Sequence, residues 1–552
     1  MSAGNAKAKR LMVQGTASSA GKSLLVTALC RIFRRKGFAV APFKSQNMSL
    51  NSFITEEGLE MGRAQVAQAE AAGVEPSALM NPILLKPGSD HRSQVIVKGR
   101  VYATMDAREY YKMRHTLRPA VLDAFNQLAA RHEYIFIEGA GSPAEINLRE
   151  NDLANMGVAG LTDSPVILVG DIDRGGVFAS LYGTVKLLEP DEQKRIRGLV
   201  INKFRGDAAI LEPGLRQLED LLGIPVLGVL PYLDITLDEE DSLAERLNKQ
   251  KHALGLKSNA LQSHSGEMLD IAVLRLPRMS NFTDFAVFDT QPDAVLRYVA
   301  DAPSLNKPDL VIVPGSKSSI DDMRFLRESG LAGALIELHK QEVPIIGICG
   351  GFQMLGRRIL DPDQVESDNA AIDGLGLLDM ETRFASIKKT TRTRLSLLQH
   401  KGVLQGTEGM EPEGYEIHMG RSTPGPGCHF LAKRLPGGGP GLNYDIPAKC
   451  EAEYGNLAEC GQEDDNSAGC EGAVSGDGKV IGTYLHGFFD NLSFTRTLLN
   501  NLRLARRLPP LPPVSGNYAD FRESEYERLA DAVEKHLDMA LLERIIQGQD
   551  LP

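Results

Sequence analysis

The sequence of 552 residues predicts an α/β protein built from two doubly wound domains. In residues 8–238, short β-rich apolar runs alternate with segments of helical periodicity, and the same alternation starts again at residue 269. Between these parts lies a polar segment of little periodicity, residues 239–268, which we interpret as a linker. Because alternating strands and helices form right-handed βαβ units, each part should contain a mostly parallel sheet covered by helices on both faces.

The first domain, residues 8–238, contains a regular series of strand-like and helix-like segments. The strand-like runs are Leu11–Val13, Phe38–Pro42, Tyr134–Ile137, Val166–Val169 and Gly198–Ile201. Segments with helical periodicity lie between these runs, for example Ser23–Lys36 and Ala120–Arg131. This order predicts a sheet whose strands are joined by crossover helices.

The second domain, residues 269–500, has strand-like runs at Ile271–Leu274, Leu310–Val313, Pro344–Ile348 and Lys479–Thr483. Within it, residues 423–478 look irregular and contain the sequences PGPG and PGGGPG. We interpret this segment as an insertion, because compact domains rarely contain a structureless loop of that length. Residues 501–552 begin with a proline-rich stretch and continue with helical patterns, which predicts a C-terminal helical tail.

The composition excludes several classes of protein. Lys and Arg number 61 against 72 Asp and Glu, a formal charge of −11, whereas a nucleic-acid-binding protein needs a basic surface to neutralise phosphates. The sequence has no run of roughly 18 apolar residues that could span a membrane, and its first residues lack the apolar core of a secretory signal. Six cysteines are too few for a disulfide framework, so we expect a cytoplasmic protein with free thiols.

A phosphate-binding loop is predicted between the first strand and the first helix, where the sequence reads Gly-Thr-Ala-Ser-Ser-Ala-Gly-Lys-Ser. Backbone N–H groups of such a loop surround phosphate oxygens, and the N-terminus of the following helix adds a positive dipole. In this pattern the lysine reaches the β- and γ-phosphates of ATP and the last hydroxyl holds Mg²⁺. The predicted ATP-binding residues are therefore Gly15, Thr16, Ser19, Gly21, Lys22 and Ser23.

Further polar residues follow strands that should end near this loop, where open α/β sheets bind their ligands. Glu138 ends one such strand and is the predicted Mg²⁺ ligand beside Ser23, the alternative being a solvated loop acid. Asp152 lies nearby in sequence and either binds metal or substrate or caps the helix that follows. Asp171 and Asp173 end another strand, and one of them is a candidate to contact metal or substrate. Asn202, with Lys203 after the fifth strand, is predicted to bind ATP through its base, the alternative being a structural turn.

A second reactive site is predicted around Cys349. The sequence Gly-Ile-Cys-Gly-Gly, residues 347–351, follows a buried strand and precedes a helical pattern, which is typical of a nucleophile elbow with cysteine in place of serine. The helix dipole favours the thiolate, and the Gly350 N–H can donate to a developing oxyanion. A buried structural cysteine is the alternative, and the flanking glycines argue against it.

A reactive thiolate needs a partner that transfers protons. His486 follows a predicted strand and precedes a glycine, which suits a base that reaches the elbow. Gly315 and Ser316 lie in a polar glycine loop after another strand, and they either complete the oxyanion hole or form an ordinary turn. Glu416 and His418 share one face of a predicted strand and either line the pocket or face solvent.

A phosphate loop followed by a reactive cysteine resembles the cobyric acid synthases, a family of glutamine-dependent amidotransferases of adenosylcobalamin biosynthesis. The resemblance covers nearly the whole chain, and the segments Gln46–Met48 and Ser142–Leu148 are more specific to this family than the two reactive motifs. It is carried by Val13–Ser23, Pro42–Ser52, Met80–Pro87, Ile137–Leu148, Gly170–Phe178, Pro314–Ser318, the Cys349 elbow and Tyr484–Gly487.

The resemblance implies an N-terminal P-loop domain of the dethiobiotin synthetase type and a C-terminal domain like the class I glutamine amidotransferases. It implies four amidations of adenosylcobyrinic acid a,c-diamide, at the b, d, e and g side chains, with glutamine as nitrogen donor and ATP with Mg²⁺. Cys349 and His486 would be catalytic, and Gly315, Ser316 and Gly350 would form the glutamine and oxyanion pocket. The implied substrate residues are Lys44, Asn47, Asp152 and Asp173.

One position departs from the wider class. Class I amidotransferase domains usually carry a glutamate two residues after the catalytic histidine, and Phe488 stands there, which leaves open what orients His486. Three other functions share parts of the pattern: a sister amidotransferase acting on the a and c side chains, a partitioning-type ATPase, and a thiol hydrolase with a decayed ATP site. The cysteine elbow argues against the second, and Lys22, Ser23 and Glu138 argue against the third.

Overall fold

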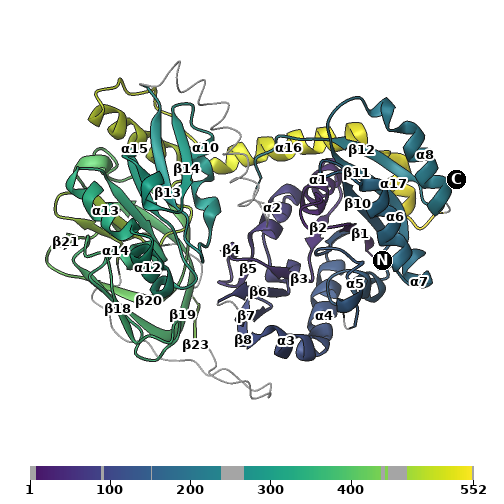
Figure 1. Ribbon diagram of the computed structural model, residues 1–552, viewed down its shortest axis with the longest axis horizontal. Helices are drawn as coiled ribbons and strands as arrows, with labels where there is room; N and C mark the ends of the chain where they lie inside the picture. Colours follow the sequence, from purple (N-terminus) through teal and green to yellow (C-terminus); the bar gives the residue numbers. More distant parts are fainter. Residues whose placement is uncertain are drawn as a thin grey trace, which may run out of the picture.

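In the computed structural model, two α/β lobes lie side by side (Figure 1). The structure describes residues 8–88, 92–150, 152–237, 267–436, 442–445 and 469–549. The linker predicted for residues 239–268 lies almost entirely outside these ranges. Each lobe contains a mainly parallel sheet, so the prediction of two doubly wound α/β units is confirmed.

The first lobe is built on a six-stranded parallel sheet with the strand order β12-β11-β10-β1-β9-β2. All the strands predicted for this lobe are present. β1 lies inside the sheet between β9 and β10, so the phosphate loop at its carboxyl end opens between two neighbouring strands. The strands are β1 (Lys9–Gly15), β2 (Val40–Phe43), β9 (Tyr134–Glu138), β10 (Val166–Asp171), β11 (Ile196–Phe204) and β12 (Val226–Pro231).

The two faces of this sheet are buried in separate hydrophobic cores. In β1, Leu11 and Val13 face one core and Met12 faces the other, as alternating side chains of a strand require. Helices therefore cover both faces. The helices of this lobe are α1 (Lys22–Arg35), α2 (Arg63–Ala72), α3 (Ala107–Met113), α4 (Arg118–Ala129), α5 (Met156–Thr162), α6 (Val177–Leu187), α7 (Pro190–Gln193) and α8 (Glu212–Leu222), of which α3 and α7 bury no residue.

A group of short strands extends the first lobe toward the second one (Figure 1). Four of them form a small sheet, β3 (Gln46–Met48), β6 (Ile83–Pro87), β7 (Arg92–Val97) and β8 (Arg100–Asp106). Two more form an antiparallel hairpin, β4 (Ser52–Ile54) and β5 (Glu60–Gly62). The sequence did not predict these strands. β3, β4 and β5 have three residues each and show too little alternation to be recognised, and the longer strands β6, β7 and β8 were not predicted either.

The second lobe has a seven-stranded sheet with the order β14-β13-β15-β16-β26-β25-β21. The pairs from β14 to β26 are parallel, and β25 and β21 are antiparallel additions at one edge. The predicted strands of this lobe are again present. The strands are β13 (Leu269–Leu274), β14 (Ala294–Val299), β15 (Leu310–Val313), β16 (Ile345–Ile348), β21 (Cys428–His429), β25 (Ala473–Ser475) and β26 (Val480–Thr483).

Short helices flank this sheet, and one of them positions the predicted nucleophile. All four residues of β16 are buried, and the strand leads directly to Cys349 at the start of α14. A buried strand, a tight turn and a helix therefore carry the thiol, as the elbow pattern predicts. The helices are α10 (Ala286–Asp289), α11 (Ala302–Leu305), α12 (Ser319–Glu328), α13 (Leu331–Lys340) and α14 (Gly350–Leu355).

A second sheet of this lobe is organised around a long strand, β19 (Met380–Leu397), which pairs with β20 (Glu413–Pro424). The segment predicted to be irregular, residues 423–478, differs from that prediction, because β21, β25 and three strands of this sheet lie there. Strands of two or three residues with distant partners leave no periodicity in the sequence. Residues 446–468 lie outside the described part. The other strands are β17 (Arg358–Leu360), β18 (Ala371–Asp373), β22 (Ala432–Arg434), β23 (Leu442–Asp445) and β24 (Cys470–Glu471).

The C-terminal helices connect the two lobes (Figure 1). α15 (Leu492–Ala505) packs on the second lobe, α16 (Tyr518–His536) reaches α1 of the first lobe, and α17 (Met539–Ile546) contacts β1 and β12. Arg31 of α1 forms ion pairs of 2.7 Å with two glutamates of α16, so a C-terminal helix is held against the first helix of the chain. In the described ranges, the structure has no helix long and apolar enough to cross a bilayer.

Candidate active sites

The phosphate loop begins at Gly15 and ends at Gly21, where α1 starts. Gly21 has a φ of 101°, a left-handed conformation that favours glycine, and a Cβ there would lie 1.9 Å from Asn202 Nδ2. Asn202 Nδ2 donates a hydrogen bond of 2.9 Å to the Ala20 carbonyl. The structure therefore places Asn202 beneath the loop as a support, which agrees with the structural alternative for this residue.

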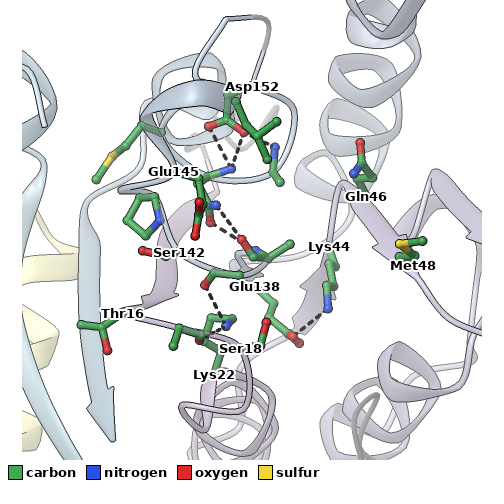
Figure 2. A pocket seen from close by; sticks show the side chains of 18 of the residues that line it. Thr16, Ser18, Lys22, Lys44, Gln46, Met48, Glu138, Ser142, Glu145 and Asp152 are labelled. Carbon is green, nitrogen blue, oxygen red and sulfur yellow. Dashed lines mark hydrogen bonds and ion pairs between the residues drawn. The ribbon is translucent and has the colours of Figure 1, made fainter. Parts of the chain in front are cut away.

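The side chains of Lys22 and Ser23, at the end of the loop, line the same cavity. Lys22 Nζ donates to the carbonyls of Ala17 and Gly141, at 2.9 and 3.1 Å. Ser23 Oγ donates to Glu138 Oε1 at 2.8 Å, which joins the loop to the end of β9. Figure 2 shows Lys22 and Glu138 in the same cavity, whose volume is about 560 Å³.

Glu138 is a buried carboxylate at this cavity. It accepts hydrogen bonds from Ser23, from Lys44 Nζ at 2.9 Å and from Gln68 Nε2 at 2.5 Å. Burial alone would raise its pKa, but the Lys44 ammonium and these hydrogen bonds outweigh that effect and lower the pKa of Glu138. An ionised carboxylate next to a hydroxyl is a donor set that fits Mg²⁺ bound to nucleotide phosphates.

The predicted substrate residues fall into two groups. Lys44 lines the cavity and is paired with Glu138. The Asp152 carboxylate also lies at the cavity, but it accepts backbone hydrogen bonds from Ala154, Asn155 and Gly157, as a helix cap does (Figure 2). Asn47 is buried against Gln65, and Asp173 forms an ion pair with Arg205, so neither of these two is brought to the cavity wall.

Cys349 occupies a strained turn between β16 and α14. Its φ of 51° and ψ of −108° are unusual for a residue with a side chain and are typical of a nucleophile elbow. A Cβ on Gly351 would lie 1.9 Å from the Val313 carbonyl, and one on Gly350 would lie 2.8 Å from Ser316 N. The glycines therefore let the elbow pack directly against the loop that contains Ser316, as predicted for an oxyanion hole.

His486 lies beside the thiol and is oriented by an acid that the sequence did not reveal. Its Nδ1 is 2.7 Å from Asp284 Oδ2, and Asp284 Oδ1 accepts a hydrogen bond of 3.2 Å from Gly487 N. Cys349 lines the same pocket as His486, and its Sγ donates a hydrogen bond of 3.5 Å to the Ile417 carbonyl. Burial would lower the pKa of His486, but the Asp284 carboxylate and Cys349 raise it to about 10. A raised pKa favours the protonated imidazole, the form that can stabilise a neighbouring thiolate.

Asp284 comes from η5 (Phe282–Phe285), a short turn after the first strand of the lobe. Its carboxylate contacts His486, whereas Phe488, which stands two residues after the histidine, is buried in the apolar core. The sequence offered one signal, the polar residues Ser280 and Asn281 just after β13, because ligands gather at the carboxyl ends of parallel strands.

The first lobe contributes to the thiol site. Lys86 of β6 lines the pocket of Cys349, and its ammonium is 2.7 Å from the buried carboxylate of Glu60. Lys388 of β19 pairs with the same carboxylate at 2.6 Å. Burial would raise the pKa of Glu60, but the two ammonium groups lower it, so this carboxylate joins the lobes as an ion.

Tyr415 forms a second connection between the lobes. Its hydroxyl donates to the Ser52 carbonyl of β4 at 2.8 Å and accepts from Asn281 Nδ2 at 2.7 Å. Its ring stacks on His486 with 5.2 Å between ring centroids. One side chain therefore contacts His486, the turn that carries Asp284 and the hairpin of the first lobe.

Glu416 and His418 lie on one face of β20, as predicted, and His418 lines the Cys349 pocket. Glu416 is buried and is held by Lys389 and Arg434 at 2.8 and 3.1 Å. The His418 ring stacks on Tyr484 with 3.8 Å between centroids. Of these two predicted residues, the structure brings His418 to the site and places Glu416 in a supporting ion-pair network.

Comparisons with known proteins agree with this two-site arrangement. A CobQ/CobB/MinD/ParA nucleotide binding domain matches residues 11–243, and a CobB/CobQ-like glutamine amidotransferase domain matches residues 270–494. A cobyric acid synthase of Alkaliphilus metalliredigens is 47% identical over 540 residues, 98% of this chain and 100% of that protein. One of Streptococcus sanguinis is 48% identical over 542 residues, 98% of this chain and 99% of that protein. The chain belongs to the cobyric acid synthase family.

Membership of the cobyric acid synthase family confirms the resemblance and the assignment as a glutamine-dependent amidotransferase. It argues against the partitioning-type ATPase, because the relatives of this family match over both lobes. The ATP-type lobe and the thiol lobe are therefore parts of one enzyme, and the contacts of Lys86 and Tyr415 show where the two parts meet.

Proposed function

We propose that the protein amidates the b, d, e and g carboxylates of adenosylcobyrinic acid a,c-diamide to give adenosylcobyric acid, in the cytoplasm, with ATP, Mg²⁺ and glutamine. The observation that carries this proposal is the Cys349–His486–Asp284 arrangement in the same chain as the Lys22 phosphate loop. The names of the full-length relatives support the corrinoid as the acceptor.

At the nucleotide site, ATP activates the acceptor. A carboxylate is a poor acceptor of ammonia, and transfer of the γ-phosphoryl group converts it to an acyl phosphate. The loop N–H groups and Lys22 stabilise charge on the transferring group. Ser23 and Glu138 would hold Mg²⁺, which neutralises phosphate charge when bound.

At the thiol site, glutamine supplies the nitrogen. The Cys349 thiolate attacks the side-chain carboxamide, and the backbone N–H groups of Gly350 and of the adjacent Ser316 loop would receive the oxyanion. His486 gives its proton to the departing ammonia and then takes one from the water that hydrolyses the thioester. Asp284 holds Nδ1, so Nε2 faces the thiol side.

Ammonia must travel from Cys349 to the acyl phosphate before it is protonated in bulk water. Because Lys86 of the first lobe lines the Cys349 pocket, the start of that route lies between the lobes. We expect a sheltered path, and isotope competition tests it. Free dilution of glutamine-derived nitrogen by external labelled ammonium would show that no sheltered path exists.

Incubation of the enzyme with glutamine, Mg-ATP and adenosylcobyrinic acid a,c-diamide tests the proposal. Mass spectrometry should show a series of products that ends with all four remaining target carboxylates converted to amides. A sister enzyme acting on the a and c side chains would leave this acceptor unchanged and consume cobyrinic acid instead. That result would overturn the assignment of the acceptor.

A further inference from the structure

The Cys349 pocket contains charged side chains that the chemistry at the amide does not use. Lys317, Glu366, Lys86 and Lys388 all line it. Lys86 and Lys388 share the carboxylate of Glu60, as described above. Lys317 and Glu366 are left as one positive and one negative group at the cavity, beside the reactive thiol.

Glu366 is held in place by its loop. The buried carboxylate of Asp361 accepts backbone hydrogen bonds from Val365, Glu366 and Ser367 at 2.8, 2.9 and 3.0 Å. Glu366 Oε2 accepts a hydrogen bond of 2.9 Å from the N–H of Ser319, in the first turn of α12. These contacts fix the position of the carboxylate at the cavity wall.

Lys317 stands next to the predicted oxyanion loop. Its backbone N–H donates to the Arg278 carbonyl at 3.0 Å, which fixes the base of the side chain. Within the part of the chain that the structure describes, the Lys317 ammonium forms neither an ion pair nor a hydrogen bond. Glu366 attracts it through space without direct contact. The two groups are thus separated charges of opposite sign.

The surroundings penalise both charges. Burial lowers the pKa of Lys317, and the ammonium groups of Lys388 and Lys86 lower it further. Burial also raises the pKa of Glu366. A ligand that brings a carboxylate to Lys317 and an ammonium to Glu366 would stabilise the charged form of each.

We propose that Lys317 and Glu366 form the subsite that recognises the main chain of glutamine, Lys317 binding the α-carboxylate and Glu366 the α-ammonium. This inference rests on the proposed use of glutamine as nitrogen donor. The two charged groups of glutamine are attached to one carbon atom, so they require neighbouring partners of opposite sign. With the main chain held there, the side-chain amide extends to Cys349, which lines the same pocket.

Two truncated amides test each contact separately. 4-Carbamoylbutanoate is glutamine without the α-ammonium, and 4-aminobutanamide is glutamine without the α-carboxylate. By kcat/KM for ammonia release, the wild type should prefer glutamine over each by about a hundredfold, as charged hydrogen bonds allow. Glu366→Gln should reduce the preference over 4-carbamoylbutanoate to about tenfold or less and keep the other preference. Lys317→Met should do the reverse.

Matched controls come from the surface of the same lobe. Glu337 and Lys340 form an exposed ion pair of 3.5 Å on α13, and Glu337→Gln and Lys340→Met should leave both preferences unchanged. Glu366→Asp should restore part of the preference that Glu366→Gln loses. Ammonia-driven synthesis at the nucleotide site reports whether each variant is folded.

Two results would overturn the inference. One is wild-type preferences in both pocket variants. The other is an equal fall in the hydrolysis of all three amides, since a purely structural role lowers every rate by the same factor. A wild-type enzyme that releases no ammonia from glutamine would instead overturn the proposed function.

Discussion

The nucleotide site and the thiol site are built on the same strand–turn–helix unit. They differ in which segments of the chain supply their other side chains. Each has a buried parallel strand, a tight turn and the N-terminus of a helix. At the nucleotide site, the partner of Ser23 is Glu138, on the strand next to β1. At the thiol site, His486 depends on Asp284 and Tyr415 from distant segments, and the pocket includes Lys86 of the other lobe.

This difference follows from what each site must do. Phosphate oxygens are recognised by backbone N–H groups and a helix dipole, which consecutive residues can supply. Proton transfer needs several side chains at hydrogen-bond distance, and only the folded chain brings such side chains together. The nucleotide site should therefore be independent of the lobe interface, whereas the thiol site should be sensitive to it.

The largest effects should come from removing one reactive group at each site. Cys349→Ala should lower glutamine-driven amidation at least about 10⁴-fold, because the nucleophile is lost, and keep ammonia-driven amidation. Lys22→Met should abolish amidation from both nitrogen sources, because charge on the transferring phosphoryl group is no longer stabilised. Mass spectrometry of the corrinoid products, with glutamine or ammonium chloride as donor, measures both.

The two variants serve as controls for each other. Each should keep the reaction of the unchanged site: ammonia-driven amidation in Cys349→Ala and glutamine hydrolysis in Lys22→Met. If Cys349→Ala also lost ammonia-driven product while remaining folded, the nucleotide site would depend on the thiol lobe, and the proposed independence would be wrong.

The next largest effect is expected for Asp284→Asn. The amide cannot hold His486 in the same tautomer or stabilise its protonated form, so kcat for glutamine hydrolysis should fall about 10³- to 10⁴-fold. Ammonia-driven amidation should stay at the wild-type level. Steady-state kinetics with both donors measures the split, and Asp289→Asn on α10 is a control from the neighbouring turn. An unchanged kcat would show that another group orients His486.

Asp284 should also make stability depend on pH in one direction. The pKa of His486 is raised from 6.5 to about 10, so the protonated imidazole stabilises the native state fully below pH 6.5. This contribution is lost as pH rises from 6.5 through about 10. The difference in free energy of unfolding between wild type and Asp284→Asn should therefore be larger at pH 6 than at pH 10. Urea denaturation at both pH values measures it, and an equal difference would contradict the role of His486.

Local patterns in the sequence predicted only those parts of each site that consecutive residues form. Gly15–Ser23 and the Cys349 elbow were found because strand, turn and helix follow one another without a break. Asp284 was missed because it lies 202 positions from His486, and its role depends on the fold. The sequence left Asp152 open between a metal or substrate ligand and a helix cap. In the fold, its carboxylate accepts hydrogen bonds from backbone N–H groups, which the sequence pattern alone does not show.

The same limit applies to the fold. Central strands such as β10 and β16 were predicted because burial on both faces leaves a continuous apolar run. The hairpin β4–β5 was not, since its strands have three residues each and are stabilised by contacts with the other lobe. This hairpin is part of the interface between the lobes. The sequence therefore predicted the two lobes but did not predict the contacts between them.

Tyr415→Phe tests that interface with a moderate expected effect. The change removes the hydroxyl that joins Ser52 of the first lobe to Asn281, and leaves the ring that stacks on His486. Loss of these buried hydrogen bonds should lower glutamine hydrolysis about tenfold. Ammonia-driven amidation should not change, and Tyr182→Phe on the exposed surface of α6 is the control. An equal fall in both activities would show that Tyr415 supports the whole fold instead of the thiol site.

The smallest effect is expected at a second buried thiol, Cys30 of α1, which completes the comparison with Cys349. Cys30 is fully buried, and burial together with the charge of Glu138 raises its pKa, so its thiol stays protonated and unreactive. Iodoacetamide at pH 8 should label Cys349 in the folded enzyme and leave Cys30 unmodified.

Cys30→Ala should reduce the free energy of unfolding by about 1 kcal/mol, through the small cavity it leaves, and should not change either activity. Mass spectrometry of the labelled peptides and urea denaturation measure the two outcomes. Rapid labelling of Cys30 would mean that α1, and with it the phosphate loop at its start, opens far more readily than its packing against α16 implies.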